Sequence, residues 1–169
     1  MSNLLYELSI VPMLRALRNL DAIVAIAEAH AEADDALHPA TLIQARLHPN
    51  MRPFVFQIRT ATDTAKGAAA RLTGVEAPSW EDDEKTFAQV HERLGKAIEY
   101  LSGFAANDFI GAENKSIELT LGPEPTHFTG ISYLSNFAVP NFFFHVTTAY
   151  NILRDNGVVI GKRDFLGKF

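Results

Sequence analysis

The stretch from Ile131 to Arg154 limits the folds open to this chain more than any other part of its sequence. Apolar residues are so dense in this stretch that no polar face remains until its last two helical turns. A helix that is hydrophobic on all sides must be buried on more than one side. We therefore expect this helix either to run through the centre of a helical bundle or to line a dimer interface as well.

Three further helices are predicted by apolar residues that recur at intervals of three and four positions. These stripes lie within residues 4–24, 51–72 and 87–101. Pro12 removes one hydrogen bond from the first of these helices, and we expect a kink there rather than a division into a short turn and a main body.

The predicted ends of the second and third helices depend on residues that commonly cap helices. Asn50 is expected to begin the second helix and Gly74 to end it. Ser79 and Asp82 have the spacing of a capping box, with Asp in place of the usual Glu, and they predict the start of the third helix.

Charged residues of these two helices are expected to lie at the surface. Asp63 and Lys66 are three positions apart on the second helix, and we interpret them as a surface ion pair. The charged residues of the third helix that we expect to face solvent are Glu92, Arg93, Lys96 and Glu99.

A short hairpin is predicted between the third and fourth helices. Ile117, Leu119 and Leu121 alternate with polar residues, and a turn follows at residues 122–125. Thr129 can then cap the fourth helix. Four long helices with short connections indicate an all-α four-helix bundle, whose ligands and metals usually lie in the core between facing helices.

The composition of the chain argues against several classes of function. The 169 residues, 47% of them hydrophobic, suit a single domain over residues 1–169. A net charge of −5 with dispersed basic residues argues against a nucleic-acid partner. The absence of cysteine excludes disulfides, thiolate metal ligands and cysteine nucleophiles. The first apolar run is interrupted by charges and proline, so we expect neither a secretory signal nor a membrane span, and a cytoplasmic protein.

Asn141 and His145 are the polar pair within the apolar fourth helix. Four positions apart, they lie on one helical face and can converge on one ion. Imidazole suits Zn, Ni or Fe, whereas an Asn amide oxygen is a weak ligand that favours hard cations. The pair alone does not hold a transition metal tightly, and a third ligand would have to come from His48, Asn50 or Asp63.

Two interpretations of the same pair need no metal. His145 can be a buried imidazole that is hydrogen-bonded to Asn141, Tyr150 or a backbone carbonyl. Pro140 also removes a helical hydrogen bond, which an Asn side chain or a water can replace. Alternatively, polar groups in an apolar cavity bind a small molecule, and that predicted ligand pocket consists of His145, Asn141, Tyr150 and Asn50.

Phe142, Phe143 and Phe144 cannot all face one core, because three consecutive helical positions span ~200°. Either the hairpin or the C-terminal tail, residues 158–166, covers one of the rings, or a symmetric homodimer buries it. We expect both, with the tail near the dimer interface.

Two long segments resemble a known family. The run LSNFAVPNFFFHVTTAYNILRDNGVVIGKRDFLG and the run PNMRPFVFQIRTATDTAKGAAARLTGVEAPSWEDDEKTF closely resemble DUF1993, a bacterial domain family of unknown function. The likeness extends from LYELSIVPMLRALRNL to GKRDFLG. That family is placed in the DinB/YfiT-like superfamily of metalloenzymes, so the resemblance implies a DinB/YfiT-like four-helix bundle.

The resemblance also implies a position for a metal. Typical DinB-like proteins hold a divalent ion with three histidines, one near the start of the second helix and two on the fourth, four positions apart. Asn141 and His145 stand at the latter two positions, so only the second matches in kind. The implied ligand set is His145, Asn141 and His48, with one Zn, Ni or Fe, although the weak set favours no tightly bound metal.

Two functions therefore remain open from the sequence. The first is a divergent metal-dependent enzyme with a degenerate metal triad. The alternative is a non-catalytic homodimeric bundle that binds a small molecule, or has an accessory role, without metal. The sequence contains no paired carboxylates, phosphate loop or nucleophile elbow that would indicate a reaction, so it does not decide whether the protein is an enzyme.

Overall fold

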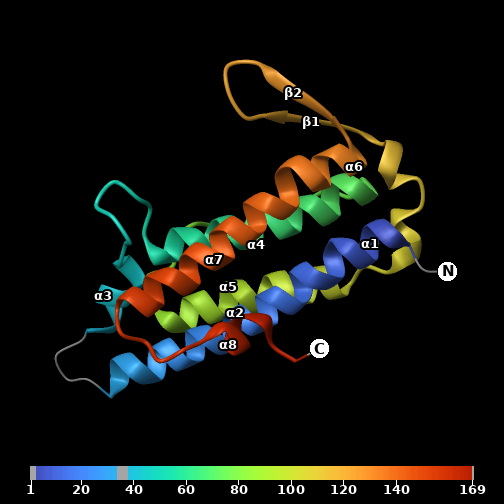
Figure 1. Ribbon diagram of the computed structural model, residues 1–169. Coiled ribbons are helices and arrows are strands. Elements are labelled where there is room, and N and C mark those ends of the chain that lie inside the picture. The colour runs from blue at the N-terminus through green and yellow to red at the C-terminus, as the bar shows by residue number, and fades with distance from the viewer. Residues whose placement is uncertain (1–2, 34–37, 169) are drawn as a thin grey trace.

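The computed structural model describes residues 3–33 and 38–168, and four long helices form its bundle (Figure 1). They are α2 (Ile10–Glu32), α4 (Phe54–Thr73), α5 (Phe87–Ser102) and α7 (Val139–Asp155). The short helices are α1 (Leu4–Leu8), α3 (Pro39–Gln44), η1 (Ala106–Phe109), η2 (Ala112–Asn114), α6 (Gly130–Tyr133), η3 (Leu134–Ala138) and α8 (Lys162–Leu166). Strands β1 (Ser116–Thr120) and β2 (Pro125–Thr129) pair antiparallel. The four-helix bundle with a hairpin before its fourth long helix is confirmed.

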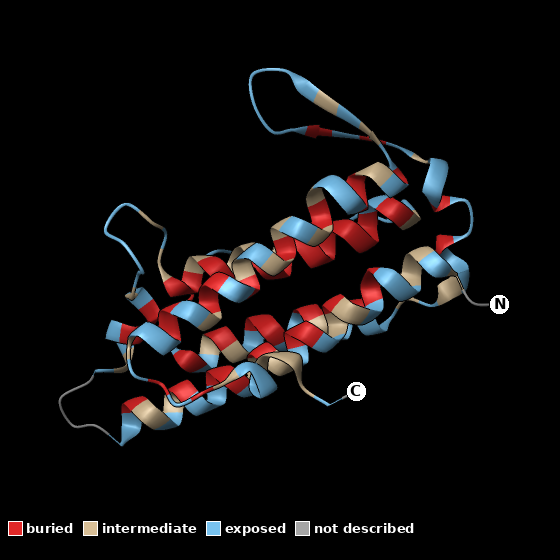
Figure 2. Cartoon of the chain, viewed as in Figure 1, coloured by how far each residue is buried: buried red, intermediate tan, exposed pale blue. Residues whose placement is uncertain are grey.

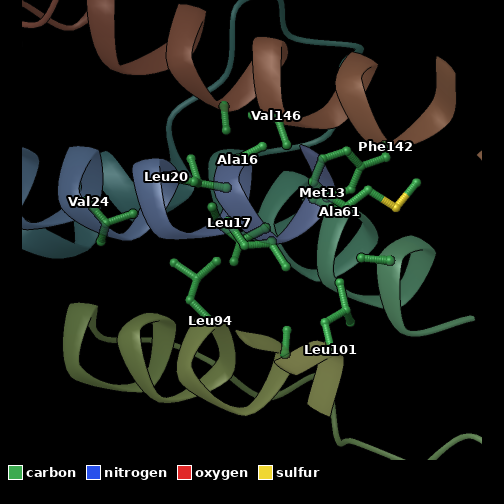
Figure 3. Close-up of a cluster of buried hydrophobic side chains, with 14 of the residues drawn as sticks. Met13, Ala16, Leu17, Leu20, Val24, Ala61, Leu94, Leu101, Phe142 and Val146 are labelled. Atoms are coloured by element: carbon green, nitrogen blue, oxygen red, sulfur yellow. The ribbon is translucent and has the colours of Figure 1, made fainter. Parts of the chain in front are cut away.

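All four long helices contribute apolar side chains to one core (Figure 3). Helix α4 packs against both α5 and α7, and α2 packs against the same two helices. In Figure 2 the buried residues of each long helix lie on its inward face, whereas the hairpin is largely exposed. Fully burying one Leu or Phe side chain contributes roughly 1.5–3 kcal/mol, so this core is the main source of stability. Side chains from the four helices that meet in Figure 3 are Met13, Leu17, Leu20, Ala61, Leu94, Leu101, Phe142 and Val146.

The first helix is divided, and the prediction of a kink at Pro12 was wrong. Ser9 has φ −125° and ψ −71°, outside the helical range, and it separates α1 from α2. In a continuous helix the Pro12 ring would clash with the carbonyl of Leu8. Once the chain breaks at Ser9, Pro12 lies in the first turn of α2, where backbone N–H groups have no helical partner. Helix α1 is therefore a separate turn at the end of the bundle.

Helix α4 starts later than predicted. Its N-cap is Pro53, not Asn50. A proline ring disfavours the helical conformation of the preceding residue, here Arg52, so a helix that began at Asn50 could not have continued through this position. Gly74 ends the helix with φ 89°, as predicted, because glycine adopts this left-handed conformation without a steric penalty.

The capping box of α5 was also placed wrongly. Thr86 and Gln89 form it: the Thr86 side chain accepts from the Gln89 N–H, and the Gln89 side chain accepts from the Thr86 N–H. Ser79 and Asp82, the predicted box, lie in the segment before the helix. The Asp82 carboxylate binds Arg93 and caps no helix. By contrast, Thr129 caps α6 together with Ser132, as predicted.

A wide turn, η3, lies directly before the fourth long helix and ahead of Pro140. In η3 the backbone adopts π-helical geometry, and the Val139 N–H donates to the Leu134 carbonyl five residues earlier. Pro140 has no N–H to continue the α-helical pattern, and the wider turn accommodates its ring. Asn141 does not replace the lost bond, because its side-chain amide donates to Thr64 on α4.

The three consecutive phenylalanines differ in burial. Phe142 is buried, Phe143 is half-buried and Phe144 is 59% exposed. The prediction that the hairpin or the tail covers the exposed ring was wrong, because α8 packs against α2 and its Phe165 ring contacts Tyr150 at a centroid distance of 5.8 Å. The homodimer stays a prediction.

Across residues 3–33 and 38–168, every helix is too short or too polar to cross a membrane.

Candidate functional site

Two hydrogen bonds join α4 and α7 through four polar side chains that we call the α4–α7 polar seam: Gln57, Thr64, Asn141 and His145. His145 Nδ1 lies 2.7 Å from Gln57 Oε1. Asn141 Nδ2 donates to Thr64 Oγ1 at 2.8 Å. Because α4 and α7 run antiparallel, the two contacts lie one or two helical turns apart along the same interface. The seam thus pairs the two candidate residues of α7 with partners on α4.

Gln57 determines which nitrogen of the His145 ring carries the proton. The Gln57 side-chain N–H group donates to the Arg52 carbonyl at 3.0 Å, so the oxygen of the same amide must face the imidazole. An amide oxygen only accepts, and His145 therefore carries its proton on Nδ1. Burial lowers the pKa of His145, so the ring is neutral near pH 7 and its Nε2 is an unprotonated acceptor.

The donor atoms of the seam do not fit a tightly held transition metal. A metal-bound histidine commonly donates its other N–H to an oxygen, and His145 meets that requirement. Its neighbours, however, offer two carboxamides and a hydroxyl, which are weak ligands for Zn, Ni or Fe. Among the residues that the structure describes, no three His, Cys, Asp or Glu side chains are grouped closely enough to hold a metal ion.

The other predicted site residues lie apart from the seam. His48 and Asn50 are exposed in the loop before α4 and contact each other at 2.7 Å. Tyr150 packs against the tail through Phe165. The structure therefore brings Asn141 and His145 together but not His48, Asn50 or Tyr150. Sequence reasoning missed Gln57 and Thr64, although both are polar residues within the buried stripe of α4, which was the available signal.

A second polar cluster lies on the opposite side of α4, around Arg93 of α5. Arg93 is 2% exposed, so the prediction that it faces solvent was wrong. Its guanidinium binds the carboxylates of Asp63, Asp82 and Glu84 at 2.9, 2.8 and 3.0 Å. It also donates to Thr62 Oγ1 and to the Glu81 carbonyl. We call Arg93, its three carboxylate partners, Arg59 and Lys66 the Arg93 network.

Lys66 and Arg59 complete this network. The Lys66 ammonium binds Asp63 at 2.8 Å and lies 4.2 Å from the centre of the Trp80 ring. Lys66 is only 9% exposed, so the prediction of a surface pair was wrong for this residue. Arg59 binds Glu84. Although burial opposes the charged form of Glu84, the hydrogen bonds from Arg59 and Arg93 keep its pKa below the ordinary value.

The Arg93 network has the features of a structural ion-pair network rather than of a catalytic site. Its carboxylates are each bound to at least one cation, which leaves no free acid and base pair. Three of its contacts, at Glu81, Asp82 and Glu84, come from the connection between α4 and α5, which has no regular secondary structure. The network therefore holds that connection against the bundle.

An apolar groove opens at one end of the bundle, between α1 and the helix formed by α6 and η3. We call it the α1–η3 groove, and its volume is about 620 Å³. Figure 1 shows α1, α6 and the yellow segment with η1 and η2 at this same end. Leu4, Leu8 and Ile131 are 71%, 66% and 61% exposed. The lining residues are Asn3, Leu4, Leu5, Leu8, Ser9, Glu113, Ile131, Leu134, Ser135 and Val139.

Local features of the backbone shape this groove. The break at Ser9 separates α1, which forms one wall, and the π-helical turn of η3 places Leu134 and Ser135 on the other. A side chain on Gly130 would collide with the Ala112 carbonyl, so only glycine allows α6 to lie directly against η2. Ligand pockets in proteins usually measure about 300–1,000 Å³ and are mostly apolar, and the groove meets both conditions.

Comparisons with known proteins identify what the chain is similar to. The family described as a domain of unknown function, DUF1993, matches residues 5–166. A crystal structure of a DinB family member protein from Shewanella denitrificans is 39% identical in sequence and has a TM-score of 0.92, over 98% of this chain and 93% of that chain. No curated protein matches. The resemblance inferred from the sequence and the DinB-like helical fold are both confirmed.

Proposed function

The chain belongs to the DUF1993 family, and we propose that it is a binding protein that takes an apolar small molecule in the α1–η3 groove, without a tightly held transition metal. The observation that carries this proposal is the groove itself, a ligand-sized hollow with exposed leucine and isoleucine side chains in its walls. Soluble proteins rarely expose contiguous apolar surface of this kind except where they bind a ligand or a partner.

The polar seam supports the metal-independent part of the proposal. The two side chains bonded to His145 and Asn141, Gln57 and Thr64, are neutral, and the Gln57 amide is also hydrogen-bonded to the Arg52 carbonyl. Near the start of α4, where a first histidine ligand would have to face His145, the residue in contact with the imidazole is Gln57, whereas the predicted ligand His48 lies in the loop before the helix. A carboxamide at that position supplies a hydrogen-bond partner for the imidazole rather than a strong ligand for the metal.

Binding in the groove is tested with the neutral fluorophore 1,6-diphenylhexatriene, whose emission rises in apolar surroundings. We expect Leu8→Gln and Ile131→Gln to weaken binding by about tenfold each, which corresponds to about 1.4 kcal/mol of lost apolar contact. Val159→Gln is the matched control, because Val159 is 82% exposed and does not line the groove. No binding by the native protein, or equal loss in all three variants, would overturn the proposal.

The metal-independent part is tested by metal content, measured by mass spectrometry on protein without a histidine tag after incubation with Zn²⁺, Ni²⁺ or Fe²⁺. We expect far less than one ion per chain in the native protein. The variant Gln57→His/Asn141→His places three imidazoles on the seam and is expected to retain about one ion. About one ion per native chain would instead favour the divergent metal-dependent enzyme.

A further inference from the structure

We infer that the groove is selective for apolar molecules that carry an amine, and that the ammonium group of the ligand pairs with the Glu113 carboxylate. This inference rests on the proposed function, since it names the class of ligand for the same groove. Its starting point is the charge of the groove. Among the described residues that line it, Glu113 is the one with a charge, so this part of the lining carries a negative charge and no cation.

Glu113 is exposed, and its carboxylate has no partner among the residues that the structure describes. Within residues 3–33 and 38–168, no basic side chain lies within ion-pair distance of it and no hydrogen bond to it is formed. Lys115, two residues further along the chain, donates to the Leu72 carbonyl at 3.4 Å. In the Arg93 network, by contrast, each carboxylate has a cation bound to it.

The other polar groups of the groove are already engaged by the protein. Asn3 Oδ1 accepts from the N–H groups of Leu5 and Tyr6, and the Ser9 hydroxyl donates to the Leu5 carbonyl. The Ser135 hydroxyl contacts the Asn136 side chain at 3.1 Å. Glu113 is thus the strongest acceptor that remains for a ligand.

The backbone holds Glu113 beside the apolar walls. Gly130 allows α6 to lie against η2, so that Glu113 of η2 and Ile131 of α6 line the same groove. An apolar molecule in the groove would therefore have its end group near a carboxylate. An ammonium at that end gains an ion pair, a hydroxyl gains a neutral hydrogen bond, and a carboxylate is repelled by the like charge.

The test compares n-decylamine, n-decanol and n-decanoate, which share one alkyl chain and differ in their end groups, as competitors of diphenylhexatriene below their micellar concentrations. We expect decylamine to displace the fluorophore at about fivefold lower concentration than decanol, as for a partly exposed ion pair, with decanoate the weakest. Glu113→Gln is expected to abolish the difference between amine and alcohol. Added salt should reduce the preference of the native protein.

Glu124→Gln is the matched control, because it removes the same charge from the exposed hairpin turn, away from the groove. It must keep the amine preference. If the preference survives in Glu113→Gln, or falls equally in Glu124→Gln, it comes from the net charge of −5 and the inference is overturned. Equal binding of all three competitors overturns the inference but leaves the proposed function standing, whereas no displacement by any of them contradicts the proposed function.

Discussion

Helix α4 is bordered by two polar regions that are built in opposite ways. Toward α7, the polar seam joins neutral groups: two carboxamides, a hydroxyl and an imidazole. Toward α5, the Arg93 network joins guanidinium and ammonium groups to carboxylates. The seam lies between two helices that pack directly, while the network fastens an irregular connection. The difference indicates that ion pairs hold the connection between α4 and α5, which has few apolar contacts of its own. Neutral hydrogen bonds are sufficient between α4 and α7, because apolar packing already holds these helices together.

The largest effect is expected from Arg93→Ala. Truncation leaves the buried Glu84 and the neighbouring Asp63 and Asp82 without their shared cation, and breaking a buried ion pair in this way costs about 3–5 kcal/mol. Urea unfolding followed by circular dichroism measures the loss. Lys96→Ala is the control, because Lys96 pairs with Glu92 on the exposed face of the same helix, and we expect it to cost below about 1 kcal/mol. Similar costs for both variants would remove the distinction between the network and surface pairs.

A smaller loss is expected on the other side of α4. His145→Ala leaves the buried Gln57 oxygen without a donor and is expected to cost about 1–3 kcal/mol in the same unfolding measurement. The double variant Gln57→Leu/His145→Leu removes both partners and should cost less than the sum of Gln57→Leu and His145→Leu. Additive losses would show that the two side chains are not coupled, which would contradict a hydrogen-bonded seam.

The smallest effect is a difference in the response of the two regions to pH. Because burial lowers the pKa of His145, the unfolded chain binds a proton more readily than the folded one, and stability falls as the pH drops below about 6.5 and through the folded pKa. The pKa of Glu84 is also lowered, and its contribution is lost only as the pH drops below about 4.3.

Thermal unfolding across this range, from about pH 8 to about pH 3, separates the two contributions. The variant His145→Gln should remove the loss that begins near neutrality and retain the one at acidic pH, and Glu84→Gln should do the reverse. A profile that neither variant changes would mean that other groups control the acid sensitivity of the fold.

Features that depend on neighbouring residues could be predicted from the sequence. Gly74 ends α4 and Thr129 starts α6 because both act on backbone groups within a few positions of themselves. The hairpin followed from alternation along Ser116–Thr120 and the turn after it. Pro12 was recognised as a disturbance, but whether it bends or divides a helix depends on where the preceding carbonyl can go, which spacing alone does not specify.

Features that depend on distant partners could not be predicted in this way. Arg93 has the position of a surface residue in its own helix, and it is buried only because residues 81–84 and Asp63 converge on it. Gln57 could be recognised as a polar residue in a buried stripe, but its partner His145 lies 88 positions away. The candidate pair on α7 was therefore found from the sequence, and the residues that determine its chemistry were not.

The π-helical turn of η3 makes the groove sensitive to the length of the chain as well as to its composition. In an α-helix each residue turns the chain by about 100°, so insertion of one further residue into Leu134–Ala138, whose turn is already wide, would rotate α6 about the helix axis by about that angle relative to α7. Ile131 would leave the groove wall, and Gly130 would no longer face Ala112. Substitutions at exposed positions of η3 can preserve the groove, whereas an insertion of a single residue there would remove it and displace the hairpin together with it.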